Sequence, residues 1–229
     1  MSTRGLGLRI GAVPIVEDVS LEVRSGEFLV IIGPNGAGKT TLFDLLSGVR
    51  RPTAGSIALG DVDVTSAPPY RRARLGLGRT FQTSTIFAEL STLENARLAA
   101  QAYLGGNAAV WRLADRERAP LERARTVLAS VGLERRGAVK AGSLSHGEKR
   151  KLDLAILLCG EPSIVLLDEP TAGMAVEDIP DMVDLIAGIH RREKKTVMMV
   201  EHRMDLVLGL ADRVAVMHHG SLLAIDTPE

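Results

Sequence analysis

The sequence contains one cysteine and few aromatic residues. Cys159 has no partner for a disulfide within the chain, and its apolar neighbours at 154–158 favour a buried structural thiol. Phe, Trp and Tyr together make up only 3% of the residues. Few side chains can therefore stack on unpaired bases, which counts against a protein that binds single-stranded nucleic acid.

The chain also lacks net charge and long apolar runs. Its 28 Lys and Arg residues balance 28 Asp and Glu residues, so no overall positive charge attracts DNA or RNA, and we expect no nucleic-acid partner. No apolar run approaches the ~18 residues that span a bilayer, and the first residues show no secretory signal pattern. We therefore expect a cytoplasmic protein.

Hydrophobic residues are nevertheless numerous enough for a large folded core, at 45% of 229 residues. Short apolar runs alternate with helical patterns, which predicts an α/β fold with a mixed, mostly parallel sheet. The clearest expected strands are continuous apolar runs, as in strands buried on both faces: Phe28–Ile32, Ile164–Leu167, Thr196–Val200 and Arg213–Met217.

The middle of the chain predicts helices instead. Residues from about Thr92 to Gly142 are rich in Ala, Leu, Arg and Glu, with breaks expected at 105–107 and Gly132. Apolar residues recur there at helical spacing, at Leu121, Ala124, Val127, Leu128 and Val131. We therefore expect a helical insert within the α/β core.

The most informative motif is a glycine-rich segment between the expected strand Phe28–Ile32 and an apolar helical stretch, Leu42–Leu46. This order fits the phosphate-binding pattern G-x-x-x-x-G-K-[ST], in which backbone N–H groups and a helix N-terminus face an anion. We predict that Lys39 reaches the β- and γ-phosphates of a nucleotide and that Thr40 binds Mg²⁺. The candidate nucleotide-binding residues are Gly33, Pro34, Asn35, Gly36, Ala37, Gly38, Lys39, Thr40 and Thr41.

Two adjacent carboxylates, Asp168 and Glu169, follow the expected strand Ile164–Leu167. In open α/β sheets, ligands bind beyond the carboxyl ends of the strands. We expect Asp168 to hold Mg²⁺, directly or through water, and Glu169 to activate the attacking water. Without a phosphate-binding loop, the same pair would be equally consistent with a solvated turn.

Three further sites depend on their context. Gln82 can contact Mg²⁺ or the attacking water, although an isolated glutamine is by default a surface residue. His202 follows the strand Thr196–Val200 and can stabilise charge that develops on a γ-phosphate. The segment Leu144–Glu148 begins a predicted helix and is either a seat for an anion or an ordinary N-cap. The remaining histidines lack metal-ligand spacing, so we assign no transition-metal site: His146, His190, His218 and His219.

These motifs, in this order and over essentially the whole chain, resemble those of the ATP-binding cassette (ABC) ATPase family. Residues 33–40 are similar to its Walker A loop, Gln82 to its Q-loop, and residues 164–169 to its Walker B strand. Residues 144–148 are similar to its signature motif, and His202 is similar to its switch histidine.

The resemblance implies an ABC ATPase fold in a single domain, 1–229. A RecA-like P-loop NTPase core would cover about 1–82 and 148–229, with an inserted α-helical subdomain at about 83–147. The cofactors implied are ATP and Mg²⁺. Glu169, His202 and Gln82 would be catalytic, and Thr40, Gln82 and Asp168 would hold the metal.

Two subunits of this family sandwich two ATP molecules. The candidate contacts from the second subunit are Ser145, Gly147 and Glu148. The chain would form a homodimer, or a heterodimer with a second ABC ATPase. It would dock on transmembrane permease subunits through Gln82 and residues 83–95, peripheral on the inner face of the cell membrane. An extracytoplasmic solute-binding protein would be an indirect partner.

The finer resemblance is to importer ATPases. Residues 79–82 and 172–174 are similar to subunits that energise branched-chain amino-acid importers, whereas residues 144–149 also resemble urea and short-amide importers. We favour branched-chain amino acids. The alternatives are a urea or short-amide importer and an exporter or lipid-extraction ATPase. A single cassette with a short insert counts against a translation or DNA-repair ATPase.

The chain departs from the family pattern at several positions. His146 replaces the first glycine of the signature, and Glu148 replaces its glutamine. Ile10 stands where an aromatic residue usually stacks on adenine, so we expect weaker base selectivity. Ala175 replaces a common aspartate, and Arg203 stands where an aspartate is common and is expected to form a surface salt bridge.

Overall fold

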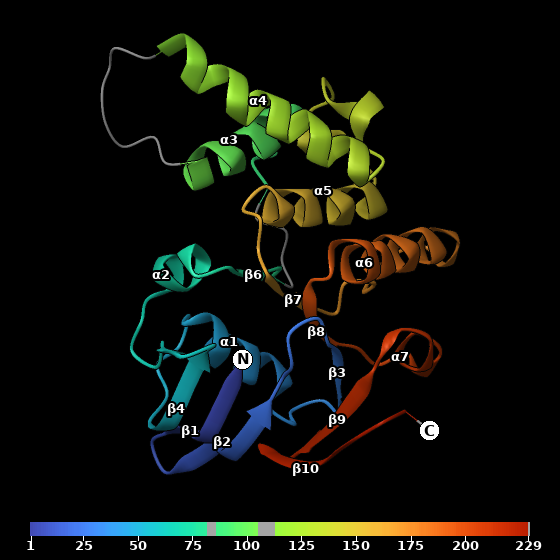
Figure 1. Cartoon of the computed structure of the whole chain (residues 1–229). Coiled ribbons are helices and arrows are strands. Elements are labelled where there is room, and N and C mark those ends of the chain that lie inside the picture. Colours follow the sequence, from blue (N-terminus) through green and yellow to red (C-terminus); the bar gives the residue numbers. More distant parts are fainter. Residues whose placement is uncertain (82–85, 105–112, 229) are drawn as a thin grey trace. The chain divides into compact units, whose positions relative to one another are not determined.

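The computed structural model describes residues 1–81, 86–104 and 113–228. Gln82 and the break expected at 105–107 lie outside them. The chain forms two compact units (Figure 1). We call the first the core unit; it consists of Met1–Arg79, Ser163–Pro170 and Ile186–Glu229. The second, the helical unit, consists of Thr80–Pro162 and Thr171–Leu185.

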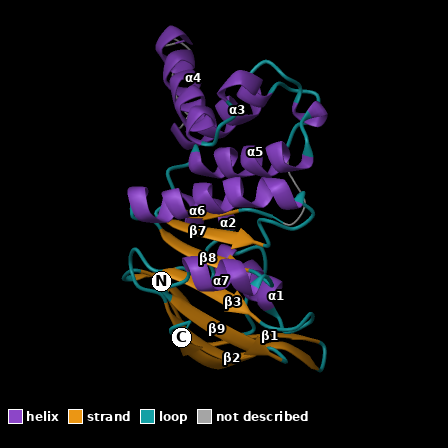
Figure 2. Cartoon of the chain, turned by 90° about the vertical axis from the view of Figure 1, so that its right-hand side faces the viewer, coloured by secondary structure: helices purple, strands orange, loops and turns teal. Residues whose placement is uncertain are grey.

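The core unit contains a six-stranded sheet in the order β10-β9-β3-β8-β7-β6. Its strands are β3 (Phe28–Ile32), β6 (Leu77–Arg79), β7 (Ile164–Asp168), β8 (Thr196–Val200), β9 (Arg213–His218) and β10 (Ser221–Asp226). All neighbours are parallel except β9 and β10. Figure 2 shows β7, β8, β3 and β9 side by side. The four strands expected from the sequence are confirmed, each to within one residue at its ends.

Burial explains why these strands were recognisable. Phe28, Leu29, Val30 and Ile31 of β3 have no exposed surface, and all of β8 is buried. A strand covered on both faces requires a continuous apolar run rather than alternation.

A second, antiparallel sheet has the order β2-β1-β4-β5. Its strands are β1 (Ser2–Ile10), β2 (Val13–Glu22), β4 (Ala54–Leu59) and β5 (Val62–Asp63). The sequence did not single these strands out. In β2, for example, buried Val16, Val19 and Leu21 are separated by exposed polar residues in irregular steps, because the β1–β2 pairing shifts register three times.

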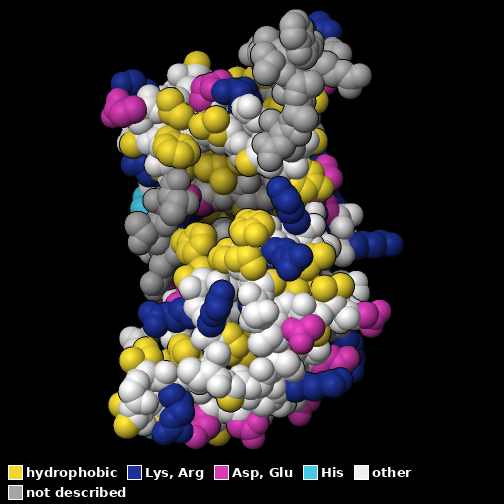
Figure 3. Space-filling view, turned by 90° about the vertical axis from the view of Figure 1, so that its left-hand side faces the viewer, with side chains coloured by type: hydrophobic (Ala, Val, Ile, Leu, Met, Phe, Trp, Pro, Cys, Tyr) yellow, Lys and Arg dark blue, Asp and Glu magenta, His cyan; other side chains and the backbone are white. Residues whose placement is uncertain are grey.

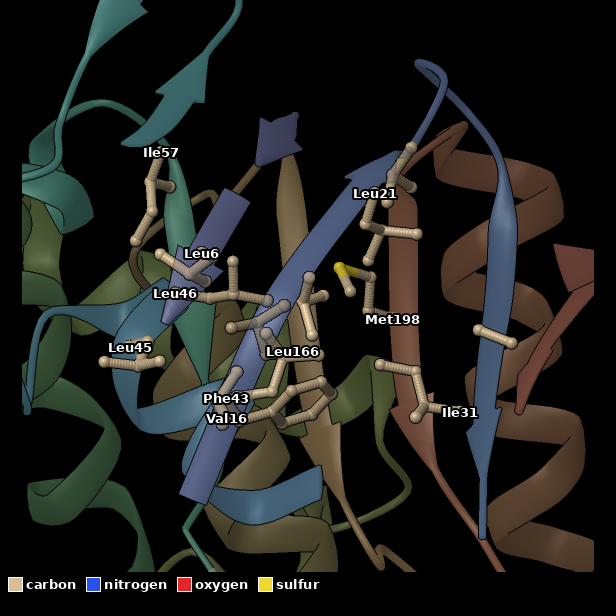
Figure 4. Close-up of a cluster of buried hydrophobic side chains, with 14 of the residues drawn as sticks. Leu6, Val16, Leu21, Ile31, Phe43, Leu45, Leu46, Ile57, Leu166 and Met198 are labelled. Atoms are coloured by element: carbon tan, nitrogen blue, oxygen red, sulfur yellow. The ribbon is translucent and has the colours of Figure 1, made fainter. Parts of the chain in front are cut away.

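A hydrophobic cluster joins both sheets to helix α1 (Lys39–Ser47). Figure 4 shows α1 side chains between residues of the antiparallel sheet and residues of β3, β7 and β8. The residues labelled there are Leu6, Val16, Leu21, Ile31, Phe43, Leu45, Leu46, Ile57, Leu166 and Met198. Each such side chain contributes roughly 1.5–3 kcal/mol relative to an exposed one. Helix α1 is therefore held along its length by apolar contacts.

The remaining core-unit helices are short: α2 (Pro69–Arg74) and α7 (Met204–Leu210). Helix α6 (Ile179–Glu193) begins in the helical unit and ends in the core unit. No helix among the described residues is both long and apolar enough to cross a bilayer.

The helical unit contains α3 (Thr92–Leu104), α4 (Leu113–Ser130) and α5 (His146–Leu158), which pack on one another. The expected helical periodicity is confirmed, because Ala124, Val127, Leu128 and Val131 are buried. Gly132 follows α4 with a φ of 76°, as expected of a helix break. The helical segment expected at about 83–147 lies within this unit, which also contains α5 and residues 171–185.

A buried arginine closes the C-terminal end of α1. Arg72 on α2 is only 1% exposed. Its Nη1 donates to the carbonyls of Leu45 and Leu46 at 2.6 and 2.7 Å, and its Nε and Nη2 donate to those of Ala67 and Thr65. The last carbonyls of a helix have no partner within the helix. That of Leu45 also accepts from the Gly48 N–H, and Arg72 adds a charged donor to it and to that of Leu46.

Replacing this arginine should destabilise the core unit. Arg72→Met removes four hydrogen bonds of a buried guanidinium, two of them to the buried carbonyls of Leu45 and Leu46, and we expect a loss of about 2–4 kcal/mol in the free energy of unfolding. Urea unfolding followed by circular dichroism measures it. The matched control is Arg71→Met, at an exposed position of the same helix, which should change stability by less than about 0.5 kcal/mol. Equal losses in the two variants would contradict this role.

Candidate nucleotide-binding site

Four adjacent parallel strands of the six-stranded sheet carry the candidate residues at or just beyond their carboxyl ends. The glycine-rich loop follows β3, His202 follows β8, Glu169 follows β7, and Arg79 ends β6. Because parallel strands bring their carboxyl ends to the same edge, residues distant in the sequence meet there. The site described here lies entirely within the core unit.

The loop between β3 and α1 needs its glycines. Gly33, Gly36 and Gly38 have φ values of 151°, 79° and 94°, which disfavour other residues. A Cβ on Gly33 would collide with the Met217 carbonyl, and one on Gly38 would lie 2.8 Å from the Ile15 carbonyl. The loop is thus pressed against neighbouring strands, which fixes the direction of its backbone N–H groups.

Positive groups converge on this loop. The N-cap of α1, Gly38, offers no side-chain cap, so no side chain blocks the positive end of the helix dipole. Lys39 Nζ donates to the carbonyls of Gly33 and Pro34 at 2.7 and 2.9 Å and so lies across the loop. Burial lowers the pKa of Lys39, while Glu169 and Asp168 act to raise it. An anionic phosphate suits this concavity.

Asp168 and Thr40 form an oxygen-rich pair beside the loop. The Thr40 hydroxyl donates to Asp168 Oδ1 at 3.5 Å, the long limit of a hydrogen bond. Burial raises the pKa of Asp168, and the Arg79 guanidinium acts most strongly against that rise. A hydroxyl and a carboxylate are the ligand types that Mg²⁺ prefers, so the residues fit this ion. In the part of the chain that the structure describes, no cluster of three or more His, Cys, Asp or Glu residues could hold a metal.

Glu169 and His202 face each other at the ends of β7 and β8. His202 Nε2 lies 3.0 Å from Glu169 Oε1. Glu169 has a φ of 49°, and its N–H donates to the carbonyl of Val200 at 3.0 Å. Such a left-handed conformation costs about 1–3 kcal/mol in a residue other than glycine and is common at functional sites. Here it is maintained by the bond to the neighbouring strand.

The sequence alone does not predict a role for two charged residues of the site, Glu201 and Arg79. Glu201 is buried, and its Oε2 accepts from the backbone N–H groups of His202 and Arg203 at 2.8 and 3.4 Å. Arg79 pairs with Asp168. The only signal in the sequence was their place next to strand ends. Arg203 makes its expected surface ion pair, with Asp205 at 2.8 Å.

The signature segment lies in the helical unit and caps its own helix. The Ser145 hydroxyl accepts from the Glu148 N–H, and the Glu148 carboxylate accepts from the Ser145 N–H, which forms a capping box. Arg136 also binds Glu148, at 2.7 Å. His146 Nε2 lies 3.2 Å from the Ala172 carbonyl. Of the two alternatives left open by the sequence, the N-cap is present, and contact with an anion remains a prediction.

Two other positions singled out from the sequence are Ile10 and Gly147. Ile10 ends β1, pairs with Val13 across the β1–β2 hairpin, and is 54% exposed. It therefore offers an accessible aliphatic surface. Gly147 is buried, and a Cβ there would lie 2.8 Å from Asp178 Oδ2, so the signature backbone packs closely against the Asp178 side chain.

Comparisons with known proteins identify the family of this chain. Residues 16–172 match the ABC transporter family. The high-affinity branched-chain amino acid transport ATP-binding protein LivG of Escherichia coli K12 is 37% identical over 234 residues, covering 100% of this chain and 92% of that protein. The lipopolysaccharide export system ATP-binding protein LptB of Acidithiobacillus ferridurans is 34% identical over 221 residues, covering 94% and 85%.

A solved structure gives the same result for the fold. A nucleotide-free ATP-binding cassette from an ABC transporter superposes with a TM-score of 0.86 at 26% identity, covering 100% of this chain and 91% of that one. The expected RecA-like core with helices is thereby confirmed as the fold class. Because the family match spans more than half of the sequence and LivG is similar along all of it, the chain belongs to the ABC transporter family.

Proposed function

We propose that this chain is the ATP-hydrolysing subunit of an importer for branched-chain amino acids. The observation that carries the proposal is its similarity to LivG along the whole chain. LptB is a second candidate type, because it is nearly as similar but is named for lipopolysaccharide export. Both types of transporter need ATP hydrolysis, so the choice of solute must be tested through the partners.

The phosphate groups of ATP would bind in the glycine-rich loop. Its backbone N–H groups, the N-terminus of α1 and Lys39 supply the positive charge, with Pro34, Asn35, Gly36, Ala37 and Thr41 completing the lining. Thr40 and Asp168 would hold Mg²⁺, with Gln82 as a further ligand. The bound ion neutralises charge on the β- and γ-phosphates.

Glu169 is the proposed general base. Its carboxylate would take a proton from the attacking water, and its Oε1 lies 3.0 Å from His202 Nε2 on the neighbouring strand. The N–H bond of Glu169 to β8 fixes the backbone of this residue, which limits the reorganisation needed before reaction. The His202 imidazole would also donate to the γ-phosphate oxygens.

We further propose that two ATPase subunits close over the nucleotides. Ser145, Gly147 and Glu148 of one subunit would meet the phosphates held by the other, as a homodimer or with a second ABC ATPase. The pair would bind permease subunits at the inner face of the cell membrane. A solute-binding protein would deliver the solute to the permeases. Tyr70 of α2 and Leu75, which follows α2, are exposed on the core unit, and Figure 3 shows hydrophobic and basic side chains together on one face of the molecule. Such a mixed surface suits a protein partner.

Removing the proposed base should separate binding from hydrolysis. In Glu169→Gln, we expect ATP to bind as before while kcat falls at least about 100-fold, because the amide cannot accept the proton. Size-exclusion chromatography with ATP should show a stable dimer. Glu193→Gln, at an exposed glutamate on α6, is the control and should keep wild-type turnover. Wild-type turnover in Glu169→Gln would assign the base to another residue.

We expect the site to discriminate only weakly between adenine and guanine nucleotides. Ile10 offers neither an aromatic face nor a hydrogen-bonding group to an adenine, so we expect kcat/KM for ATP and GTP to differ by less than about tenfold. Steady-state kinetics with both nucleotides measures the ratio. Ile10→Tyr should lower KM by about tenfold through restored stacking. A strong ATP preference in the wild type would refute this expectation.

The importer assignment is tested by affinity purification from detergent-solubilised native membranes, with mass spectrometry of the bound proteins. We expect two polytopic permeases, a second small ATPase and a solute-binding protein, whose affinity for leucine, isoleucine and valine is then measured by calorimetry. Recovery of a lipopolysaccharide-export assembly would favour the LptB type. A binding protein that holds urea or short amides would replace the solute while leaving the importer assignment intact.

A further inference from the structure

A buried arginine links the carboxylate of β7 to helix α1. The Arg79 side chain is only 5% exposed. Its Nη1 donates to Asp44 Oδ1 at 2.7 Å and to Ser47 Oγ at 2.9 Å, both on α1. Its Nη2 lies 3.3 Å from Asp168 Oδ2, and its guanidinium carbon lies 5.8 Å from the centre of the Phe43 ring. One guanidinium thus bridges two carboxylates on different elements.

Because of this bridge, the two carboxylate oxygens of Asp168 have different partners. Oδ2 accepts from Arg79, while Oδ1 accepts from the Thr40 hydroxyl at 3.5 Å. The Asp168 side chain has no exposed surface, so solvent cannot orient or stabilise it. Rotation of the carboxylate would break the contact with Arg79, and the oxygen on the Thr40 side is therefore the one presented to a ligand of the loop.

We propose that Arg79 is a positioning residue for the magnesium carboxylate: it holds Asp168 Oδ2 and ties it to α1, so that Oδ1 stays beside Thr40. The inference rests on the proposed function, because it takes Asp168 and Thr40 as the groups that hold Mg²⁺. Arg79 itself would touch neither the metal nor the nucleotide.

The geometry requires the fork of an arginine, not just a positive charge. A guanidinium presents donors in fixed directions and can engage Asp44 and Asp168 together, whereas a lysine ammonium is a single point on a flexible stem. Asp44 in turn anchors the fork on the helix that also carries Thr40. The two proposed metal-holding residues are therefore connected through α1 as well as directly.

A neighbouring arginine offers a matched control. Arg50 Nε also pairs with Asp44, at 3.2 Å, but its side chain is 51% exposed. Among the described residues, its only ion pair is with Asp44 and none joins it to Asp168. A change at Arg50 therefore perturbs the anchor from the solvent side without touching the metal carboxylate.

The test uses Mn²⁺ as a paramagnetic probe of the metal site. Full-length wild type, Arg79→Lys and Arg50→Lys are saturated with ADP and titrated with Mn²⁺, and the bound ion is followed by electron paramagnetic resonance. We expect Arg79→Lys to weaken Mn²⁺ binding by at least about tenfold, as outer-shell changes at metal sites do. Arg50→Lys should change it less than about twofold. ADP affinity in EDTA should be unchanged in both variants.

Each other outcome has a definite meaning. Wild-type Mn²⁺ affinity in Arg79→Lys would overturn the proposal, and so would an equal loss of ADP affinity in EDTA, because the effect would then not be specific to the metal. If Arg79→Lys does not fold, Asp44→Asn carries the test: it keeps Arg79 but weakens its anchor, and it should weaken Mn²⁺ binding by at least about threefold, with no change overturning the proposal. Failure of the wild type to bind Mn²⁺ with ADP would count against the proposed function itself.

Discussion

The parallel alignment of four strands is the constraint on which the site depends. Strands β6, β7, β8 and β3 run side by side in the same direction, so the residues that follow them arrive at one edge. No contact between these residues is needed to bring them together, because the backbone ladder does so. The apolar burial of β3 and β8 stabilises the ladder. The buried Asp168 carboxylate at its edge is paired with Arg79.

Helix α1 fixes the position of the phosphate-binding loop that precedes it. Its middle is packed between the two sheets, its C-terminal carbonyls are bound by Arg72, and its N-terminus is held where glycines allow close approach to Met217 and Ile15. Arg79 adds a polar link between α1 and β7. A helix fixed at its middle and both ends keeps its dipole aimed at the loop, so an anion meets a site that is already organised.

The chemistry of the cassette and the identity of the solute are separate properties. LivG and LptB differ in what they are named for, yet both are similar to this chain across nearly all of it. A site built from strand ends and a phosphate-binding loop suits the hydrolysis of ATP, which transporters of different solutes share. Specificity for a solute therefore belongs to the surfaces that meet the permease and to the partners themselves.

The phosphate-binding loop, the carboxylate pair Asp168 and Glu169, and the buried strands were predictable from the sequence, because each depends on a local pattern or a continuous apolar run. The antiparallel sheet escaped prediction, since its strands are half exposed and irregular in register. The facing of Glu169 and His202, the capping role of Glu148, and the bridge from Arg79 to Asp168 and Asp44 could not be predicted in this way. A single charged residue carries no sequence signal of its partner, because the packing of strands and helices selects that partner.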